Sequence, residues 1–144
     1  MSNEISEWKQ SDLEVQAFAL HFLKAFEDLD MPIFSDCFAD EATAFFPAPE
    51  PPLRVEGKSA IQQRFEIVFA GIRKSASGGP PYHSLPPQDM LVQMITPETA
   101  LVSFHLVNAE RTARRTLVVV KSSGGWRILH LHASNSMQVT KAQR

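Results

Sequence analysis

The chain is predicted to fold as a single α+β domain, with helices in its first half and an antiparallel sheet in its second half. Apolar residues recur at helical spacing before residue 75, whereas from residue 85 onward the signal is purely β. The run from Arg114 to Ser136 then reads as two strands joined by a turn at 122–125, whose glycines supply the positive φ angles of a tight hairpin. Because such a hairpin is not stable alone in water, the earlier elements are expected to cover it.

The size and charge of the chain exclude several classes of protein. Its 144 residues suit one domain, predicted to span residues 11–136 between a flexible N-terminus at 1–10 and a flexible tail at 137–144. The net charge of −2 gives a nucleic-acid partner no electrostatic support, and no apolar run approaches the roughly 20 residues of a membrane span. The chain is therefore expected to bind neither nucleic acid nor membrane.

The first residues and the cysteine content bear on the cellular compartment. Residues 1–10 contain two acids and no apolar segment, so they are not expected to form a secretory signal. Cys37 is the one cysteine, which excludes an internal disulfide and a zinc site built from several cysteines. It is expected to be a small buried thiol. A cytoplasmic protein without a cofactor is the resulting expectation.

Three helices are predicted in the first half of the chain. Ser11–Glu14 is a capping-box pattern, and the apolar stripe behind it runs for about five turns. Asp30 offers a second N-cap, with Pro32 in the first turn of a short helix that ends near Phe38. Gly57 precedes the third helix. The stripes of the two long helices consist of Val15, Phe18, Ala19, Phe22, Leu23, Phe26 and Leu29, and of Ala60, Ile61, Phe65, Val68, Phe69 and Ile72.

The strands are predicted as one short pair and four later segments. Residues 42–46 read as a strand, and the prolines that follow make 47–53 a loop before a short return strand at 54–56. The later strands are expected at 85–95, at 100–107 and in the two arms of the hairpin. Both alternating sets of these strands are apolar, so both sheet faces need a cover. With the helices on one face, a second subunit is the simplest cover for the other.

Several landmarks occur in a set order along the chain. They are the Leu29-Asp30 corner, the run Phe38-Ala39-Asp40-Glu41-Ala42-Thr43, the run Val55-Glu56-Gly57-Lys58-Ser59-Ala60-Ile61, and the run from Gly125 to Ser134. Together they resemble the nuclear-transport-factor-like superfamily, also called the SnoaL-like or steroid-isomerase-like fold, over residues 11–136. The segment 43–47 and the ending W-x-x-x-H-x-H-x-S are most similar to the association (hub) domain of calcium/calmodulin-dependent kinase II.

This resemblance implies a fold and a partner. The fold is a cone-shaped, curved antiparallel sheet wrapped around three N-terminal helices, a cystatin-like α+β barrel with a pocket inside. The partner is a second copy of the chain, bound through the outer face of the sheet. Function does not follow from the fold, which carries isomerases, cyclases, dehydratases, hydrolases and assembly domains.

The residues that carry the family's chemistry are replaced in this chain. Steroid isomerases have a carboxylate base before a proline, and the matching position is Phe46, before Pro47. Their tyrosine donor on the first helix corresponds to Phe22. A phenyl ring can neither take a proton nor donate a hydrogen bond, so isomerisation by that mechanism is not expected. The arginines of the kinase hub pocket correspond to His105, Leu117 and Ala133, so two cations are missing.

His105 is the main acid–base candidate. It lies on the face of Leu101 and Ser103, which the comparison with the hub places inside the cone. An imidazole in an apolar cone could act as an acid or base near neutral pH. The alternative is a pocket-wall histidine that is hydrogen-bonded to a neighbour such as Ser103. Tyr82, His83 and Asp89 could reach the mouth of the pocket.

Two further groups of polar residues have open roles. His130 and His132 share one face of a strand, expected to be that of Trp126, Ile128 and Ser134, while Leu129 and Leu131 occupy the other. If the leucines line the cone, the histidines lie on the dimer-forming face, where they are interface residues or, given a third ligand, metal ligands. Arg114-Arg115 beside Arg111 is either a solvated strand end or an anion-binding rim.

Two functions are carried forward from the sequence. The first is binding of a small apolar or aromatic metabolite, with lyase- or isomerase-type turnover by His105 as a possible extension. The second is a non-catalytic dimerisation, assembly or regulatory module that resembles the kinase hub. The phenylalanines are either core or pocket wall. The expected pocket is lined by Phe22, Phe46, Ile61, Phe65, Phe69, His105, Leu117 and Leu131.

Overall fold

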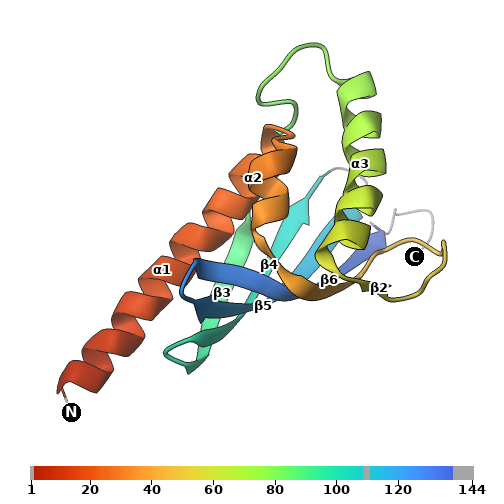
Figure 1. Cartoon of the computed structure of the whole chain (residues 1–144). Coiled ribbons are helices and arrows are strands. Elements are labelled where there is room, and N and C mark those ends of the chain that lie inside the picture. The colour runs from red at the N-terminus through yellow and green to blue at the C-terminus, as the bar shows by residue number, and fades with distance from the viewer. Residues whose placement is uncertain (1, 109–110, 138–144) are drawn as a thin grey trace.

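The computed structural model describes residues 2–108 and 111–137. Three helices precede most of the strands, with one short strand pair between the second and third helices (Figure 1). The elements are α1 (Ser2–Glu27), α2 (Met31–Asp36), β1 (Phe38–Phe45), β2 (Val55–Glu56), α3 (Lys58–Ser75), β3 (Gln88–Thr96), β4 (Thr99–Val107), β5 (Arg111–Ser122) and β6 (Gly125–Met137).

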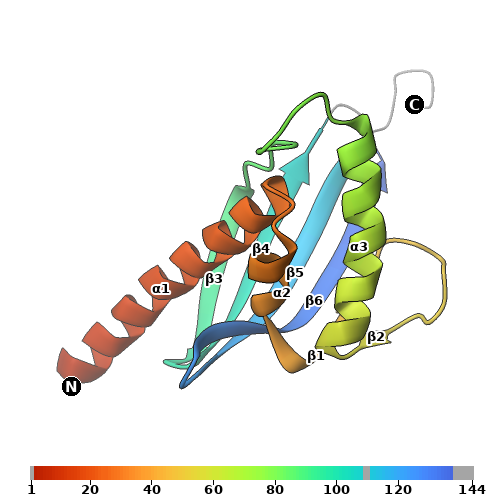
Figure 2. The same ribbon diagram turned by 45° about the horizontal axis from the view of Figure 1, so that its top comes forward.

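The strands form one six-stranded sheet in the order β2-β1-β6-β5-β4-β3. All neighbours are antiparallel except β1 and β6, which run parallel. The sheet is curved, and the three helices lie on its concave side (Figure 2). The predicted α+β class and the curved sheet around the helices are therefore confirmed, although β2 and β3 remain edges and the sheet does not close into a barrel.

The first helix begins earlier than predicted. It starts at Ser2, so the expected capping box at Ser11–Glu14 lies inside the helix. Residues 2–10 contain no proline or glycine and are rich in good helix formers, so nothing prevents the extension. The Ser11 hydroxyl instead donates to the carbonyl of Pro97 at 2.6 Å, which ties α1 to the β3–β4 turn.

The corner between the first two helices is as predicted. Leu29 adopts a positive φ of 50°, and the Asp30 side chain caps α2 by accepting from the backbone N–H of Ile33. However, α2 ends at Asp36 and β1 begins at Phe38, four residues before the expected strand. The reason is pairing with the C-terminal hairpin, because the backbone N–H of Ile128 donates to the carbonyl of Cys37 at 2.7 Å.

The start of α3 requires a glycine. Gly57 is the residue before the helix and has a φ of 94°, a conformation that other residues rarely adopt. Its backbone N–H donates to the carbonyl of Ala42 on β1 at 2.7 Å. The chain therefore turns sharply from β2 into α3 against the end of the sheet, as predicted.

The last strand contains a β-bulge at Leu129. Val118 pairs with His130 and Val119 pairs with Ile128, so one residue of β6 has no partner on β5. A bulge shifts the alternation of side chains between the two faces. Ile128 and Leu131 are therefore both buried, although they are three residues apart.

The bulge corrects one expectation and supports another. Trp126 and Ile128 were expected on the face of the histidines, but both are buried against the helices, at 7% and 0% exposure. Leu131 does face the core, and His130, His132 and Ser134 lie on the outer face with their β5 partners. The pattern of alternation could not reveal the bulge because it assumes an unbroken pleat.

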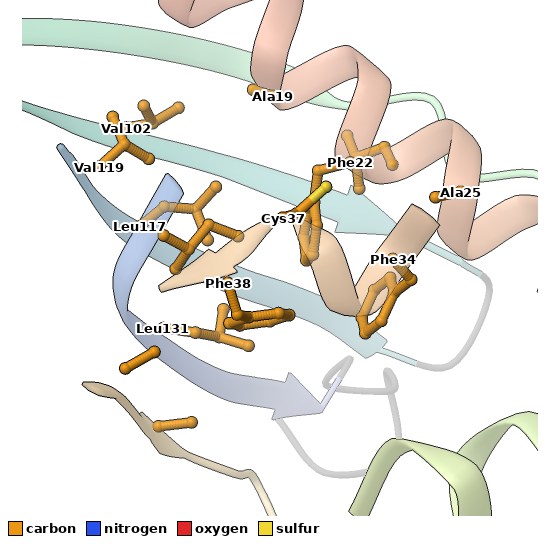
Figure 3. Close-up of a cluster of buried hydrophobic side chains, with 14 of the residues drawn as sticks. Ala19, Phe22, Ala25, Phe34, Cys37, Phe38, Val102, Leu117, Val119 and Leu131 are labelled. Carbon is orange, nitrogen blue, oxygen red and sulfur yellow. The ribbon is translucent and has the colours of Figure 1, made fainter. Parts of the chain in front are cut away.

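Aromatic rings fill the space between the helices and the sheet (Figure 3). Phe34 of α2 is central, because its ring lies 4.6–5.6 Å from the rings of five other phenylalanines and is 1% exposed. Cys37 is buried beside them, and burial raises the pKa of its thiol to about 12. This thiol is therefore buried and protonated at neutral pH, as the sequence predicted.

Candidate functional site

The inner face of β4, β5 and β6 carries four rows of side chains. Each row takes one residue from each strand, because directly paired residues share a face. From the hairpin end toward the opposite end of the sheet, the rows are Ala100–Val119–Ile128, Val102–Leu117–Leu131, Phe104–Arg115–Ala133 and Leu106–Ala113–Asn135. We call the first two rows the closed end and the last two the open end.

Burial decreases from the closed end to the open end. Val102, Leu117 and Leu131 are at most 2% exposed, whereas Leu106 and Ala113 reach 9% and 8%. Leu85, in the loop before β3, and Met90, in β3, are half-buried. The inner face is therefore covered slightly less at the open end than at the closed end.

Most residues expected to line a pocket are packed core residues at the closed end or beneath α3. They touch one another or their phenylalanine neighbours and are between 0% and 6% exposed; they are Phe22, Ile61, Phe65, Phe69, Leu117 and Leu131. Phe46 is the exception, since it is half-buried and lies 5.1 Å from the ring of Phe65 with Arg64 over its face. It directly follows Phe45, which pairs with His132, so it lies level with Ala133 at the open end.

Arg115 is the cation of the inner face. It pairs with Phe104 on one side and Ala133 on the other, and both of these residues are buried. Burial, together with a smaller contribution from the nearby charge of Arg111, lowers the pKa of its guanidinium to about 10. Its Nη1 donates to the carbonyl oxygens of Arg114 and Ser134 at 3.0 and 3.4 Å.

Arg115 is half-buried, and no carboxylate pairs with it among the described residues. Of its five N–H donors, only those on Nη1 have protein partners within residues 2–108 and 111–137. The neighbouring Arg114 points to the outer face and donates from Nε to the hydroxyl of Ser134. The two adjacent arginines therefore occupy opposite environments.

Asn135 presents a second unsatisfied group at the open end. It pairs with Ala113, so its side chain belongs to the inner face one row beyond Arg115. Its Oδ1 is buried and has no hydrogen-bond partner among the described residues. Buried amide oxygens almost always have a donor, so this atom marks a position where a partner is missing.

A segment after α3 folds over the end of α1 beside the open end. The backbone N–H of Tyr82 donates to the carbonyl of Glu27, and His83 Nε2 lies 2.9 Å from the carbonyl of Phe26. The N–H of Leu85 donates to the carboxylate of Glu27 at 2.6 Å. Tyr82 and His83 thus pack against the end of α1 and are half-buried, whereas Asp89 is exposed.

His105 does not face the interior. In β4 the buried residues are Ala100, Val102, Phe104 and Leu106, so His105 shares the opposite, outer face with Leu101 and Ser103. The expectation that this face points into the cone is therefore wrong. It depended on an alignment that is shifted by one residue, and a shift of one residue exchanges the two faces of a strand. A role for His105 as an acid or base inside the cone loses its geometric basis.

The two histidines of β6 form a small cluster on the outer face. His130 Nδ1 lies 2.7 Å from the Thr43 hydroxyl, and the ring of Phe45 contacts both imidazoles. Burial lowers the pKa of His130, and the charges of His132 and Arg54 add to this. No third ligand joins them, because no group of three His, Cys, Asp or Glu side chains in the described ranges could hold a metal ion.

Several hollows lie on the surface. Three of them, of about 280 to 430 Å³, lie along α3 beside α2 or β1 and share Gln62, whose Oε1 accepts from the Ser35 hydroxyl. Another, of about 790 Å³, lies beside Glu14. Glu14 accepts from Trp126 and Lys121, and these bonds lower the pKa of its carboxyl to about 2. The carboxylate of Glu14 is thus satisfied by donors within the protein.

From the sequence, Arg115 was expected only at a solvated strand end or an anion-binding rim, and no role was expected for Asn135. The inner-face position of Arg115 could have been predicted, because it lies two residues before the inward-facing Leu117 in a strand without a bulge. Asn135 could not be assigned to the inner face by counting from Trp126, because the bulge lies between them.

Comparison with protein families gives one match over most of the chain. The model of the SnoaL-like domain matches residues 15–138. No curated protein matches the chain. Within residues 2–108 and 111–137, no helix is both long and apolar enough to cross a membrane.

Solved structures share the fold at low sequence identity. An NTF2-like protein of unknown function from Pseudomonas putida matches with a TM-score of 0.72 and 19% identity, over 94% of this chain and 93% of that chain. A cystatin-like fold protein from Burkholderia xenovorans matches with 0.68 and 18%, over 90% and 95%. A ketosteroid isomerase-like protein from Erwinia carotovora matches with 0.65 and 16%, over 86% and 95%. These matches establish the fold.

Proposed function

The chain belongs to the SnoaL-like family, and from that premise we propose that it binds a small, mainly apolar molecule at the open end of its sheet. One observation supports this proposal above all. The inner face remains mainly apolar through its last row, where Leu106 and Ala113 are 9% and 8% exposed, and half-buried apolar side chains lie beside it. Ligand sites are typically concave and apolar with a few polar groups. The half-buried apolar residues are Phe46, Leu85 and Met90.

The proposed site lies two rows farther from the hairpin than the pocket that was expected around Leu117 and Leu131. The phenylalanines of the closed end fill the interior and contribute stability, while Phe46 remains part of the proposed site. Turnover by His105 is not part of the proposal, because that side chain belongs to the outer face. The likeness to a structure named as ketosteroid isomerase-like is compatible with ligand handling, but Phe46 and Phe22 lack the groups for that reaction.

A binding measurement with neutral probes tests the proposal. Titration of benzyl alcohol or indole into ¹⁵N,¹³C-labelled protein is expected to shift resonances of Leu106, Ala113 and Phe46 and to leave Leu117 unchanged. The variant Ala113→Phe fills the open end and should abolish these shifts. Val107→Phe is the matched control, because Val107 lies at the same level on the outer face. Shifts that persist in Ala113→Phe, or that never occur at the open end, would rule the site out.

We also infer that the chain pairs with a second copy through the outer face. Three large apolar side chains on this face are about half exposed, namely Leu91, Ile95 and Val107 at 53%, 58% and 49%. Such side chains favour association when they are contiguous. The molar mass from sedimentation equilibrium is expected to be that of a dimer and to fall to that of a monomer in Leu91→Lys/Ile95→Lys. The control Leu53→Lys alters an exposed loop leucine and should leave the mass unchanged.

The same measurement addresses the assembly alternative. A ring larger than a dimer would favour an assembly module of the kind that the kinase hub forms. A closed dimer in which Ala113→Phe alters probe binding would favour ligand handling. A monomer at high concentration would remove both the dimer and the assembly reading.

A further inference from the structure

We propose that the molecule bound at the open end is a small carboxylate that also carries a hydroxyl group, with Arg115 binding the carboxylate and Asn135 accepting from the hydroxyl. This inference depends on the proposed function, since it specifies the ligand of the same site. It rests on two side chains on adjacent strands of one face: the described residues satisfy only part of the Arg115 guanidinium and leave Asn135 Oδ1 without a partner.

The first group is the guanidinium of Arg115. A buried charge is costly unless it is paired, and side chains of this kind are rarely buried without a counter-ion. Here the only protein acceptors among the described residues are two carbonyl oxygens, both bound by Nη1. The donors on Nε and Nη2 remain available. A ligand that supplies a negative charge at this point would satisfy them and would gain charge-assisted hydrogen bonds.

The geometry of the guanidinium favours a carboxylate among the possible anions. Its Nε and Nη2 form one edge of a planar fork, which matches the two oxygens of a carboxylate. The row partners of Arg115 are Phe104 and Ala133, so the walls around it are apolar. One cation in apolar surroundings suits a monoanion better than a phosphate, which carries nearly two charges at neutral pH. Arg111 adds positive potential at the same end of β5.

The second group is the amide of Asn135. Because Arg115 pairs with Ala133, Asn135 is its diagonal neighbour on the inner face, and such neighbours are about 7–8 Å apart at the backbone. Its unsatisfied Oδ1 requires a donor, which a carboxylate cannot supply. A hydroxyl close to the carboxylate can supply it. The two unsatisfied protein groups therefore define a ligand with an acceptor and a donor next to each other and an apolar remainder.

Three probes of nearly the same size test the two contacts separately. Mandelate has the carboxylate, the hydroxyl and a phenyl ring; phenylacetate lacks the hydroxyl; methyl mandelate lacks the charge. By isothermal titration calorimetry we expect mandelate to bind best, phenylacetate several-fold more weakly and methyl mandelate roughly ten- to a hundredfold more weakly, as the loss of a charge-assisted hydrogen bond implies.

The adjacent arginines provide a matched pair of variants. Arg115→Met keeps the length and apolar stem of the side chain but removes the charge from the inner face. It should reduce mandelate affinity to that of methyl mandelate. Arg114→Met removes the same charge from the outer face and should leave all three affinities unchanged. A third variant, Asn135→Leu, should equalise mandelate and phenylacetate.

The melting temperature of the free protein distinguishes a binding role of Arg115 from a structural role. If Arg115 is held for a ligand, replacing a half-buried charge that has no counter-ion among the described residues with an apolar side chain should raise the melting temperature of the free protein by a few degrees. Asn135→Asp should do the same by pairing with Arg115, and it should also abolish mandelate binding. If Arg115 instead contributes to the fold, Arg115→Met will lower the melting temperature, which would overturn the proposal.

The remaining outcomes distinguish this inference from the proposed function. Equal affinities for mandelate and methyl mandelate, unchanged in Arg115→Met, would overturn the carboxylate assignment and leave the apolar site in place. Equal affinities for mandelate and phenylacetate would overturn the role of Asn135. Absence of binding by all three probes, together with unchanged neutral-probe spectra in Ala113→Phe, would overturn both proposals.

Discussion

The closed and open ends of the inner sheet face are built from the same three strands, yet they differ in how their side chains are satisfied. At the closed end, Val102, Leu117 and Leu131 are at most 2% exposed beneath the helices. At the open end, the floor is still mainly apolar, but Arg115 and Asn135 carry groups without partners in the described chain. The difference shows that one continuous surface can contribute stability at one end and remain available to a ligand at the other.

The largest effect should come from the same substitution made at each end. Leu117→Ala removes a side chain with 0% exposure and leaves a cavity among packed neighbours, so the free energy of unfolding should fall by about 3–4 kcal/mol. Leu106→Ala on the open end, where the neighbours are looser, should cost roughly 2 kcal/mol. Urea denaturation monitored by circular dichroism measures both. Equal losses would mean that the two ends are equally well packed.

A smaller effect should come from the polar contact that fastens the closed end. Glu14 of α1 accepts from Trp126 Nε1 at 2.9 Å and from Lys121 Nζ at 3.0 Å, which joins the helix to the β5–β6 hairpin. Glu14→Gln weakens both bonds and should lower the free energy of unfolding at pH 7 by about 1 kcal/mol or less, because the pair is partly solvated.

The same variant predicts a change in the pH dependence of stability. The bonds from Trp126 and Lys121 lower the pKa of Glu14 from 4.5 to about 2. A group whose pKa is lower in the folded state contributes its full stability above pH 4.5, and the contribution is lost as the pH falls toward 2. The loss of stability over this range should therefore be smaller in Glu14→Gln. Asp28→Asn, which removes an exposed i,i+4 pair of α1, is the control and should change little.

The smallest effect should come from the outer face. His105→Ala removes a half-buried side chain that faces away from the core, so the free energy of unfolding should change by about 0.5 kcal/mol or less. Probe binding at the open end should be unchanged, because the substitution lies on the opposite side of β4. Loss of mandelate binding in this variant would mean that a change on the outer face of β4 alters the inner face, contrary to the burial pattern.

Much of the fold could be predicted because it depends on local signals. The glycine-rich hairpin, the Asp30 cap, the Gly57 turn and the helical stripes each express a short-range preference of the backbone. The errors arose where distant pairing decided the outcome. Strand β1 begins at Phe38 because Cys37 and Ile128 are hydrogen-bonded, and nothing near Phe38 in the sequence signals that contact.

The site was harder to predict because it depends on which face each residue occupies. A shift of one residue moved His105 from the expected inner face to the outer face, and the bulge at Leu129 hid the inward position of Asn135. Periodicity identified apolar residues correctly but could not show which of them were sealed. Leu117 and Phe46 look alike as candidates in the sequence, and only the cover provided by the helices separates them.

The bulge at Leu129 also has a consequence for the shape of the molecule. A strand bends where it carries an extra residue, and this one lies between the first and second rows of the inner face. Loss of one codon there would leave every β5–β6 partner in place and still straighten the strand. We expect the inner face to become flatter without a change in any residue of its four rows, so the curvature of this face and its chemistry could evolve independently.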